Sequence, residues 1–190
     1  SFTLNLVSRE AITNETMRVG KKFPTSEKIS NSVNDILKNY LRISDDKINY
    51  VEETQNKYGF IGNMKKPFSI ITWLSAKSVS GKAKPSEDSS AGYVFFQSQN
   101  GYNFCSIDFL MEQGFVHKIK NLNSFIACSH PENTHSPTFM ICRKCEKVAE
   151  IDEKKSGLKF DKKSLSEFKI EESIIEIIGI CKKCISLEAI

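Results

Sequence analysis

Residues 1–107 mix strand-like and helix-like hydrophobic patterns. Apolar and polar residues alternate over residues 2–6, which predicts a strand. Over residues 26–41 apolar side chains recur at helical spacing, so we expect a helix with Ser26 as its N-cap. Pro67 suits the first turn of a second helix, because its fixed φ angle and missing N–H are tolerated there. This half is therefore predicted to be a small mixed α/β module.

The end of this half is predicted to form an exposed loop and then a hairpin. Residues 80–91 are polar and rich in serine, lysine and proline, which is typical of a loop. The segment GYVFFQSQNGYNFCS, residues 92–106, places apolar stretches on both sides of Asn100 and Gly101. These two residues can supply the positive φ angles of a tight turn, so the segment predicts a β-hairpin.

The pattern changes near residues 105–112, where a domain boundary is expected. The segment IDFLMEQGF predicts a helix end closed by Gly114. Strands are predicted at 116–119, 124–128, 138–142, 147–151 and 172–180, and a short helix within 154–168. The predicted fold class is α+β, with two small domains, 1–107 and 108–190. The second domain should contain a three-stranded sheet and a helix.

Composition places the chain among globular proteins. Hydrophobic residues make up 39% of the chain and charged residues 26%, and no apolar run approaches the ~20 residues that a membrane-spanning helix needs. The net charge of +4 arises before residue 108 and is too small to indicate nucleic-acid binding by itself. Nothing in the chain resembles a secretion signal, so we expect a cytoplasmic protein with no membrane partner.

Four of the six cysteines form two CxxC pairs, Cys142 with Cys145 and Cys181 with Cys184. Two intervening residues let both thiolates of a pair face one point, and four sulfurs satisfy tetrahedral Zn²⁺. In a reducing cytosol such pairs indicate a structural metal site rather than disulfides, which are the first alternative. A rubredoxin-like iron site and four free thiols are the others. The residues between the ligands are basic and could offset the charge of four thiolates: Arg143, Lys144, Lys182 and Lys183.

Other residue types that bind metals surround the first cysteine pair in sequence: His117, Cys128, His130, His135 and Glu150. His117 and Cys128 fall on two predicted strands joined by the turn KNLN, so a hairpin would make them neighbours. One nitrogen-rich metal site could be built from this group. The alternative is surface histidines with a buried cysteine and a solvated glutamate.

The stretch from residue 107 to residue 184 resembles the zinc-responsive branch of the ferric uptake regulator family. The resemblance rests on DFLMEQGFVHKIKNLNSFIACSHPENTHSPTFMICRKCEKVAEID, which is similar to the wing and sensor region, and on IEIIGICKKC, which is similar to the final strand and ligand pair. It implies a dimeric, DNA-binding transcriptional repressor in which the four paired cysteines hold structural zinc. It also implies a sensory zinc at His117, Cys128, His135 and Glu150, and it assigns no role to His130.

Two features depart from that family. A regulator of this kind would carry a winged helix of about eighty residues before the wing, whereas here only IDFLMEQG resembles the end of its recognition helix. The DNA reader is therefore predicted to be truncated. Residues 1–107 instead resemble, more weakly, a tail or baseplate structural protein of contractile-tailed bacteriophages, on segments such as YGFIGNMKKPFSIITWLSAKSVS. Either a natural fusion or an artificial join would explain the junction near 105–112.

The sequence thus predicts a zinc-binding, metal-responsive regulatory module, homodimeric through its C-terminal domain and fused to an unrelated N-terminal module. The alternative is a virion structural protein that assembles with phage tail components and whose terminal domain is stapled by zinc. An enzyme is not expected, because a catalytic zinc keeps an open coordination position and neither predicted four-ligand site leaves one.

Overall fold

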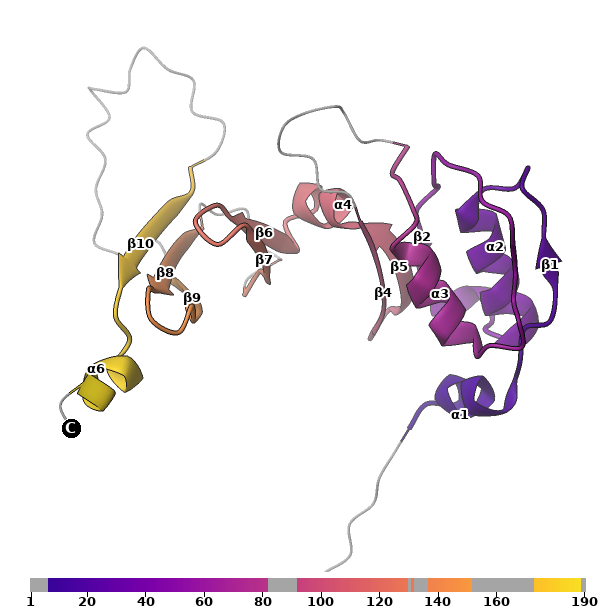
Figure 1. The fold of residues 1–190 in the computed structure, drawn as a ribbon, viewed down its shortest axis with the longest axis horizontal. Helices are drawn as coiled ribbons and strands as arrows, with labels where there is room; N and C mark the ends of the chain where they lie inside the picture. The colour runs from indigo at the N-terminus through magenta and orange to yellow at the C-terminus, as the bar shows by residue number, and fades with distance from the viewer. Residues whose placement is uncertain (1–6, 82–91, 130, 132–136, 152–172, 189–190) are drawn as a thin grey trace, which may run out of the picture. The chain divides into compact units, whose positions relative to one another are not determined.

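The computed structural model describes residues 7–81, 92–129, 131, 137–151 and 173–188 (Figure 1). Contacts between Cα atoms divide the chain into two compact units, Ser1–Leu110 (unit 1) and Met111–Ile190 (unit 2). The chain combines helices with several small sheets, which confirms the mixed α and β character predicted from the sequence. The strand predicted at 2–6, most of the loop at 80–91 and the helix within 154–168 lie outside the described residues.

Unit 1 contains a helix that the hydrophobic pattern did not predict, α1 (Arg9–Thr16). Ser8 is its N-cap, and the Ser8 Oγ accepts a hydrogen bond from the Ala11 N–H at 3.1 Å. Its buried residues are Glu10 and Asn14. Because these are polar, no apolar stripe marks this helix in the sequence.

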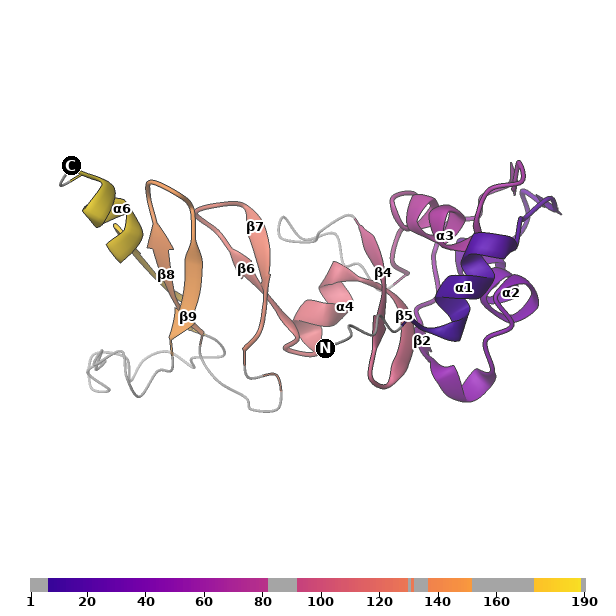
Figure 2. The same ribbon diagram turned by 90° about the horizontal axis from the view of Figure 1, so that it is seen from below.

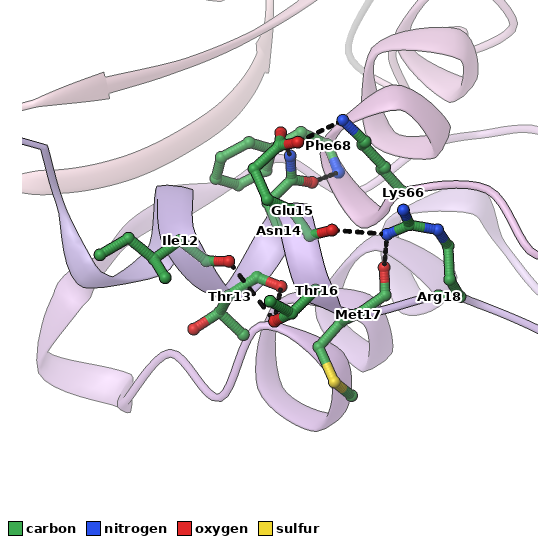
Figure 3. Close-up of polar contacts among 9 residues, drawn as sticks. All are labelled: Ile12, Thr13, Asn14, Glu15, Thr16, Met17, Arg18, Lys66 and Phe68. Atoms are coloured by element: carbon green, nitrogen blue, oxygen red, sulfur yellow. Dashed lines mark hydrogen bonds and ion pairs between the residues drawn. The ribbon is translucent and has the colours of Figure 1, made fainter.

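Helix α3 (Pro67–Ser75) begins with proline, as predicted, and α1 completes its N-terminus (Figure 3). Its N-cap is Lys66, whose ammonium group cannot accept a hydrogen bond from a helix N–H. The Asn14 side chain of α1 accepts one from the Phe68 N–H at 2.8 Å, and Glu15 forms an ion pair with Lys66. A residue 54 positions earlier therefore supplies the cap of α3.

The long helix predicted at 26–41 consists of α2 (Ile29–Asp35) and a π-helical turn, η1 (Ile36–Tyr40). The prediction that Ser26 is its cap is wrong, because the N-cap is Lys28. The hydroxyl of Thr54 accepts a hydrogen bond from the Ser30 N–H at 3.1 Å. As in α3, a partner distant in sequence replaces the local cap.

Two small sheets complete unit 1. The larger sheet has the strand order β2 (Ile48–Val51), β5 (Gly101–Ser106), β4 (Tyr93–Ser98). The smaller sheet pairs β1 (Lys22–Phe23) with β3 (Phe60–Ile61). A 3₁₀ turn, η2 (Asp45–Lys47), precedes β2. Strands β4 and β5 form the predicted antiparallel hairpin, and β2 runs parallel to β5. Gly101 has a φ of +122°, and a Cβ there would lie 2.3 Å from the Lys47 carbonyl oxygen. Asn100 does not have a positive φ, contrary to prediction; its N–H donates to the Ser98 hydroxyl at 3.2 Å.

The core of unit 1 is built from aliphatic and aromatic side chains of β1, α2, η1, α3, β4, β5 and the loops that adjoin them. Its buried residues are Val19, Phe23, Ile29, Val33, Ile36, Leu37, Leu41, Ile43, Ile70, Ile71, Leu74, Tyr93, Tyr102 and Phe104. Trp73, the only tryptophan of the chain, lies at the edge of this core, 40% exposed and edge-on to the rings of Tyr58 and Phe60. It is therefore a fluorescent reporter confined to unit 1.

At the start of the second half, α4 (Ile107–Glu112) ends as predicted, with Gly114 at a φ of +72°. It is followed by an antiparallel hairpin of β6 (Val116–Ile119) and β7 (Ser124–Ala127). The turn between these strands, residues 120–123, ends at Asn123, which has a φ of +45°. This is the hairpin that the sequence predicts around KNLN.

The three strands predicted beyond the hairpin form one sheet in the order β10 (Ile175–Gly179), β8 (Thr138–Cys142), β9 (Val148–Ile151) (Figures 1 and 2). Strand β10 runs parallel to β8, and β9 runs antiparallel to it. A helix that was not predicted, α6 (Lys182–Glu188), follows β10.

Within the described residues, unit 2 has a much smaller core than unit 1. Its buried cluster consists of Ile119, Phe139 and Ile141, with four partly buried side chains packed on it: Leu122, Ile126, Val148 and Ile174. The hairpin β6–β7 and the three-stranded sheet therefore share one small apolar interface. Among the described residues, none of the helices combines the length and apolar content that crossing a bilayer requires.

Candidate metal centres

The two cysteine pairs, 39 positions apart in sequence, meet at one end of the three-stranded sheet. Cys142 ends β8, and the parallel register pairs it with Gly179 at the end of β10. Cys181 follows two residues later, so it emerges beside Cys142. The sulfur atoms of Cys142, Cys145, Cys181 and Cys184 all lie within 4.8 Å of one another. The structure thus brings together all four cysteines that the sequence pairs.

Each pair is held by a tight backbone turn. In the turn from β8 to β9 the Glu146 N–H donates to the Cys142 carbonyl at 2.8 Å, and the Cys142 N–H donates to the Lys147 carbonyl at 2.9 Å. Glu146 takes a φ of +56° to close this turn. In the second pair Cys181 precedes α6, and its carbonyl accepts the Ile185 N–H at 3.0 Å. Both turns direct two thiols toward a common point.

The distance between two of the sulfurs matches that expected around a tetrahedral metal ion. Four sulfurs at about 2.3 Å from a zinc ion would be about 3.8 Å from one another. The sulfurs of Cys145 and Cys181 are 3.7 Å apart. None of the six cysteines, which all fall within the described ranges, forms a disulfide, so the disulfide alternative does not describe this fold. The cluster is suited to a metal ion.

Hydrogen bonding prepares part of this cluster for ionisation. The backbone N–H of Cys181, which lies 3.3 Å from the Cys142 sulfur, and those of Cys145 and Lys144 lower the pKa of Cys142 to about 6. The backbone N–H of Cys184 lowers the pKa of Cys181. Contacts with the thiols of Cys181 and Cys145 raise the pKa of Cys184 to about 12. The Cys142 thiol therefore loses its proton more readily than that of Cys184, and a divalent metal would displace the protons that remain.

A second group of ligand atoms lies between the hairpin and β9. His117 is on β6, Cys128 directly follows β7 and Glu150 is on β9; one ligand atom from each lies within 4.8 Å of the others. The Glu150 Oε1 is 4.0 Å from the His117 Nε2 and 4.0 Å from the Cys128 sulfur. The structure thus gathers three of the four residues predicted for a sensory site. The fourth, His135, and also His130 lie outside the described residues.

The second group is largely shielded from solvent. The side chain of Glu150 is 3% exposed and that of His117 is 12% exposed. The Ser129 N–H donates to the Glu150 Oε2 at 2.7 Å, which leaves Oε1 directed at the other two ligand atoms. The ring of His117 lies 5.7 Å from that of Phe139, at the core of unit 2. A nitrogen atom from β6, a sulfur atom from the residue after β7 and an oxygen atom from β9 thus converge on one point.

Part of this chain is similar to zinc uptake regulation proteins. Those of Escherichia coli (strain K12) and Shigella flexneri are each 35% identical to it over 88 residues, which is 44% of this chain and 50% of theirs. The chain therefore spans about half the length of the curated relatives it matches. No protein-family model matches the chain.

Two solved structures are also similar in sequence. A zinc uptake regulator complexed with zinc and DNA is 31% identical, over 44% of this chain and 57% of that one, with a TM-score of 0.38. Holo XcZur is 32% identical, over 42% and 58% of the two chains, with a TM-score of 0.36. With TM-scores below 0.5, neither structure bears on the fold of this chain. The likeness of residues 1–107 to phage tail proteins stays a prediction.

Two features of these sites were not predicted from the sequence: helix α6 and the backbone donors. Helix α6, which carries Cys184, was not predicted, although the residues after Cys181 contain no glycine or proline up to the end of the chain. The backbone N–H of Ser129 donates a hydrogen bond to Glu150. The backbone N–H of Lys144 helps to lower the pKa of Cys142. Backbone donors carry no residue signature, so only the folded chain identifies them.

Proposed function

We propose that residues 108–190 form a zinc-binding, metal-responsive regulatory module of the kind found in zinc uptake regulators. The observation that carries the proposal is the meeting of four cysteine sulfurs, drawn from two distant CxxC pairs, within 4.8 Å of one another. The 35% identity to zinc uptake regulation proteins over 88 residues supports zinc as the metal and regulation as the role. That identity covers half of those proteins, so the activity of a whole regulator is part of the proposal.

The four-cysteine centre is proposed to hold Zn²⁺ for structure rather than for sensing. Four sulfur ligands close the coordination shell, so no position remains for water or substrate. Cys142 ends β8 and Cys145 lies in the turn to β9, whereas Cys181 lies between β10 and α6 and Cys184 is on α6. These ligands would therefore join the C-terminal ends of β8 and β10 at one end of the sheet, and metal binding would be coupled to the folding of unit 2.

The second centre is proposed to be the sensory site, with His117, Cys128 and Glu150 as ligands and His135 as the fourth. A mixed set of nitrogen, sulfur and oxygen ligands from separate strands must lose protons and assemble before it binds, so occupancy should vary with metal concentration and pH. The buried carboxylate of Glu150, directed at both His117 and Cys128, supports this role because it favours a cation there.

Dimerisation and DNA binding are proposed by analogy with the regulators, with the DNA reader truncated. Helix α4 is the one element resembling a recognition helix, and it spans Ile107–Glu112 only. We therefore expect this chain to form homodimers through unit 2 but to bind operator DNA with little sequence specificity. Nanomolar, salt-resistant and sequence-specific binding in a titration with operator duplexes would contradict the truncation.

Metal analysis of the full chain tests the proposal. The purified protein should contain two zinc ions per chain, and a mild chelator should remove one and leave the other. His117→Ala should abolish the easily removed zinc, while Lys118→Ala on the same strand should leave both. One tightly held zinc in wild-type protein would instead favour the alternative, a terminal domain stapled by zinc. A folded protein that binds no zinc would overturn both.

A further inference from the structure

One row of side chains crosses the three-stranded sheet from edge to edge. In the register of the sheet, Glu176 of β10 pairs with Phe139 of β8, and Phe139 pairs with Glu150 of β9. Directly paired residues of neighbouring strands project from the same face of a sheet. Two carboxylates therefore flank the fully buried Phe139 on the face that packs against the β6–β7 hairpin.

The two carboxylates hold opposite ends of that hairpin. At its open end, Glu150 accepts the Ser129 N–H at 2.7 Å and approaches the ligand atoms of His117 and Cys128. At its turn, Glu176 accepts the Lys120 N–H at 2.6 Å through Oε1. Figure 2 shows the hairpin beside the sheet, and these hydrogen bonds attach both ends of the hairpin to it.

The anchor at the turn is the charged carboxylate of Glu176. The Oε2 of Glu176 accepts hydrogen bonds from the Asn121 N–H at 3.1 Å and from the Asn121 side-chain amide. Partial burial raises the pKa of Glu176, but these donors and the Lys120 N–H outweigh it and leave the pKa lower than its usual value. Hydrogen bonds to an ionised acceptor are roughly twice as strong as neutral ones, so this anchor is stiff.

The hairpin turn is linked to the ligands by a short stretch of strand. His117, on β6, lies three residues before Lys120 of the turn, and Ile119 between them is fully buried in the core of unit 2. A hairpin fixed at its turn and packed at Ile119 can shift His117 and Cys128 little relative to Glu150. The free energy needed to organise these ligands is then supplied during folding, so metal binding does not have to supply it.

We propose that Glu176 is a positioning residue, which anchors the turn of the β6–β7 hairpin to β10 and so pre-orients His117 and Cys128 for metal binding. This inference rests on the proposed sensory role of the second centre. It also implies that β10, which leads into Cys181, couples the two centres: loss of metal from the four cysteines would loosen β10 and weaken the second centre.

Zinc titrations of the full chain against a competing chelator test this role. Glu176→Ala should weaken zinc binding at the second centre by about tenfold or more, the loss typical when a residue that orients metal ligands is removed. Glu176→Gln retains one carbonyl acceptor and should lose less. The zinc of the four cysteines should remain in both variants. Glu112→Ala, which removes an exposed carboxylate from α4, is the matched control and should bind zinc as wild type does.

The ligand-field spectrum of Co²⁺ in the second centre separates positioning from general stability. It should change in Glu176→Ala and be partly restored in Glu176→Gln, whereas a merely structural role would lower the unfolding temperature and leave affinity and spectrum unchanged. Two zinc ions in wild type with unaltered affinity in both Glu176 variants would overturn this inference alone. A wild-type chain with no second zinc would overturn the proposed function, and this inference with it.

Discussion

The two units of this chain differ in what holds them together. Unit 1 buries fourteen hydrophobic residues in one cluster, whereas the corresponding cluster in the described part of unit 2 has three. Unit 2 instead gathers two groups of residues that could hold metal ions. Small domains whose apolar core is insufficient commonly depend on a metal or disulfides. We therefore expect packing to stabilise unit 1 and a metal ion held by the four cysteines to stabilise unit 2.

Removing the four-cysteine centre should give the largest effect. Cys145→Ser changes an exposed ligand with little loss of packing, so it tests the metal rather than the core. Structural zinc contributes on the order of 10 kcal/mol to small domains. Hydrogen exchange should therefore show loss of protection in β8, β9 and β10, while Trp73 fluorescence shows unit 1 still folded.

Cys128→Ser is the matched control, because it removes a thiol of the same unit from outside the four-sulfur cluster. It should retain the tightly held zinc and the protection of the sheet. If Cys145→Ser kept the same protection as Cys128→Ser, the dependence of unit 2 on metal would be wrong.

A cavity in the core of unit 1 should give the next largest effect. It should destabilise unit 1 and leave unit 2 unchanged. Phe104 is fully buried, and truncating such a side chain costs about 3–5 kcal/mol. Phe104→Ala should lower the denaturant midpoint measured by Trp73 fluorescence without changing the zinc content. Phe96→Ala, on the same hairpin but 38% exposed, should cost clearly less. Loss of zinc from Phe104→Ala would mean that the two units do not fold independently.

High pH should weaken unit 1 through its buried thiol. Burial, with a further contribution from Glu52, raises the pKa of Cys105 from its usual value near 9 to about 12. The neutral thiol thus contributes stability that is complete below pH 9 and is lost as the pH rises toward 12, by up to about 1.4 kcal/mol per pH unit. Urea unfolding followed by Trp73 fluorescence should show this slope, and Cys105→Ala should flatten it.

Low pH should affect unit 2 instead, because protons compete with metal for its thiolates. Zinc retention measured by dialysis should fall as the pH falls, over a range in which unit 1 keeps its Trp73 signal. If zinc and the Trp73 signal were lost over the same pH range, the two units would not differ in their sensitivity to low pH.

The smallest effect is expected at the junction of α1 and α3. Asn14→Ala removes the acceptor for the Phe68 N–H and should cost about 1 kcal/mol, as loss of a helix cap does. Lys66→Ala breaks the exposed ion pair with Glu15 and should cost less than that. Equal losses in urea unfolding would mean that the Asn14 contact does not act as a cap.

Local signals in the sequence predicted a good part of this fold. Pro67 marked the start of α3, Gly114 the end of α4, and the β4–β5 and β6–β7 hairpins followed from their turn segments. The features that sequence missed depend on tertiary partners. Ser26 has the chemistry of a cap, but the Ser30 N–H is satisfied by Thr54.

In the candidate sites, too, local features were predicted from local residue patterns and features that depend on tertiary contacts were not. CxxC spacing identified the four cysteines, because the ligand geometry is largely local to each pair. The grouping of His117, Cys128 and Glu150 came from a family resemblance and depends on the packing of a hairpin against a sheet. Glu176 could not be identified from sequence, since its contacts follow from the register of β10 against β8 and from backbone donors of the turn.

X-ray absorption at the zinc edge tests the central claim most directly. After mild chelation has removed the loosely bound ion, the remaining zinc should be surrounded by four sulfur atoms at about 2.3 Å. A shell containing two or more nitrogen or oxygen neighbours, or a folded sample without bound zinc, would contradict the account.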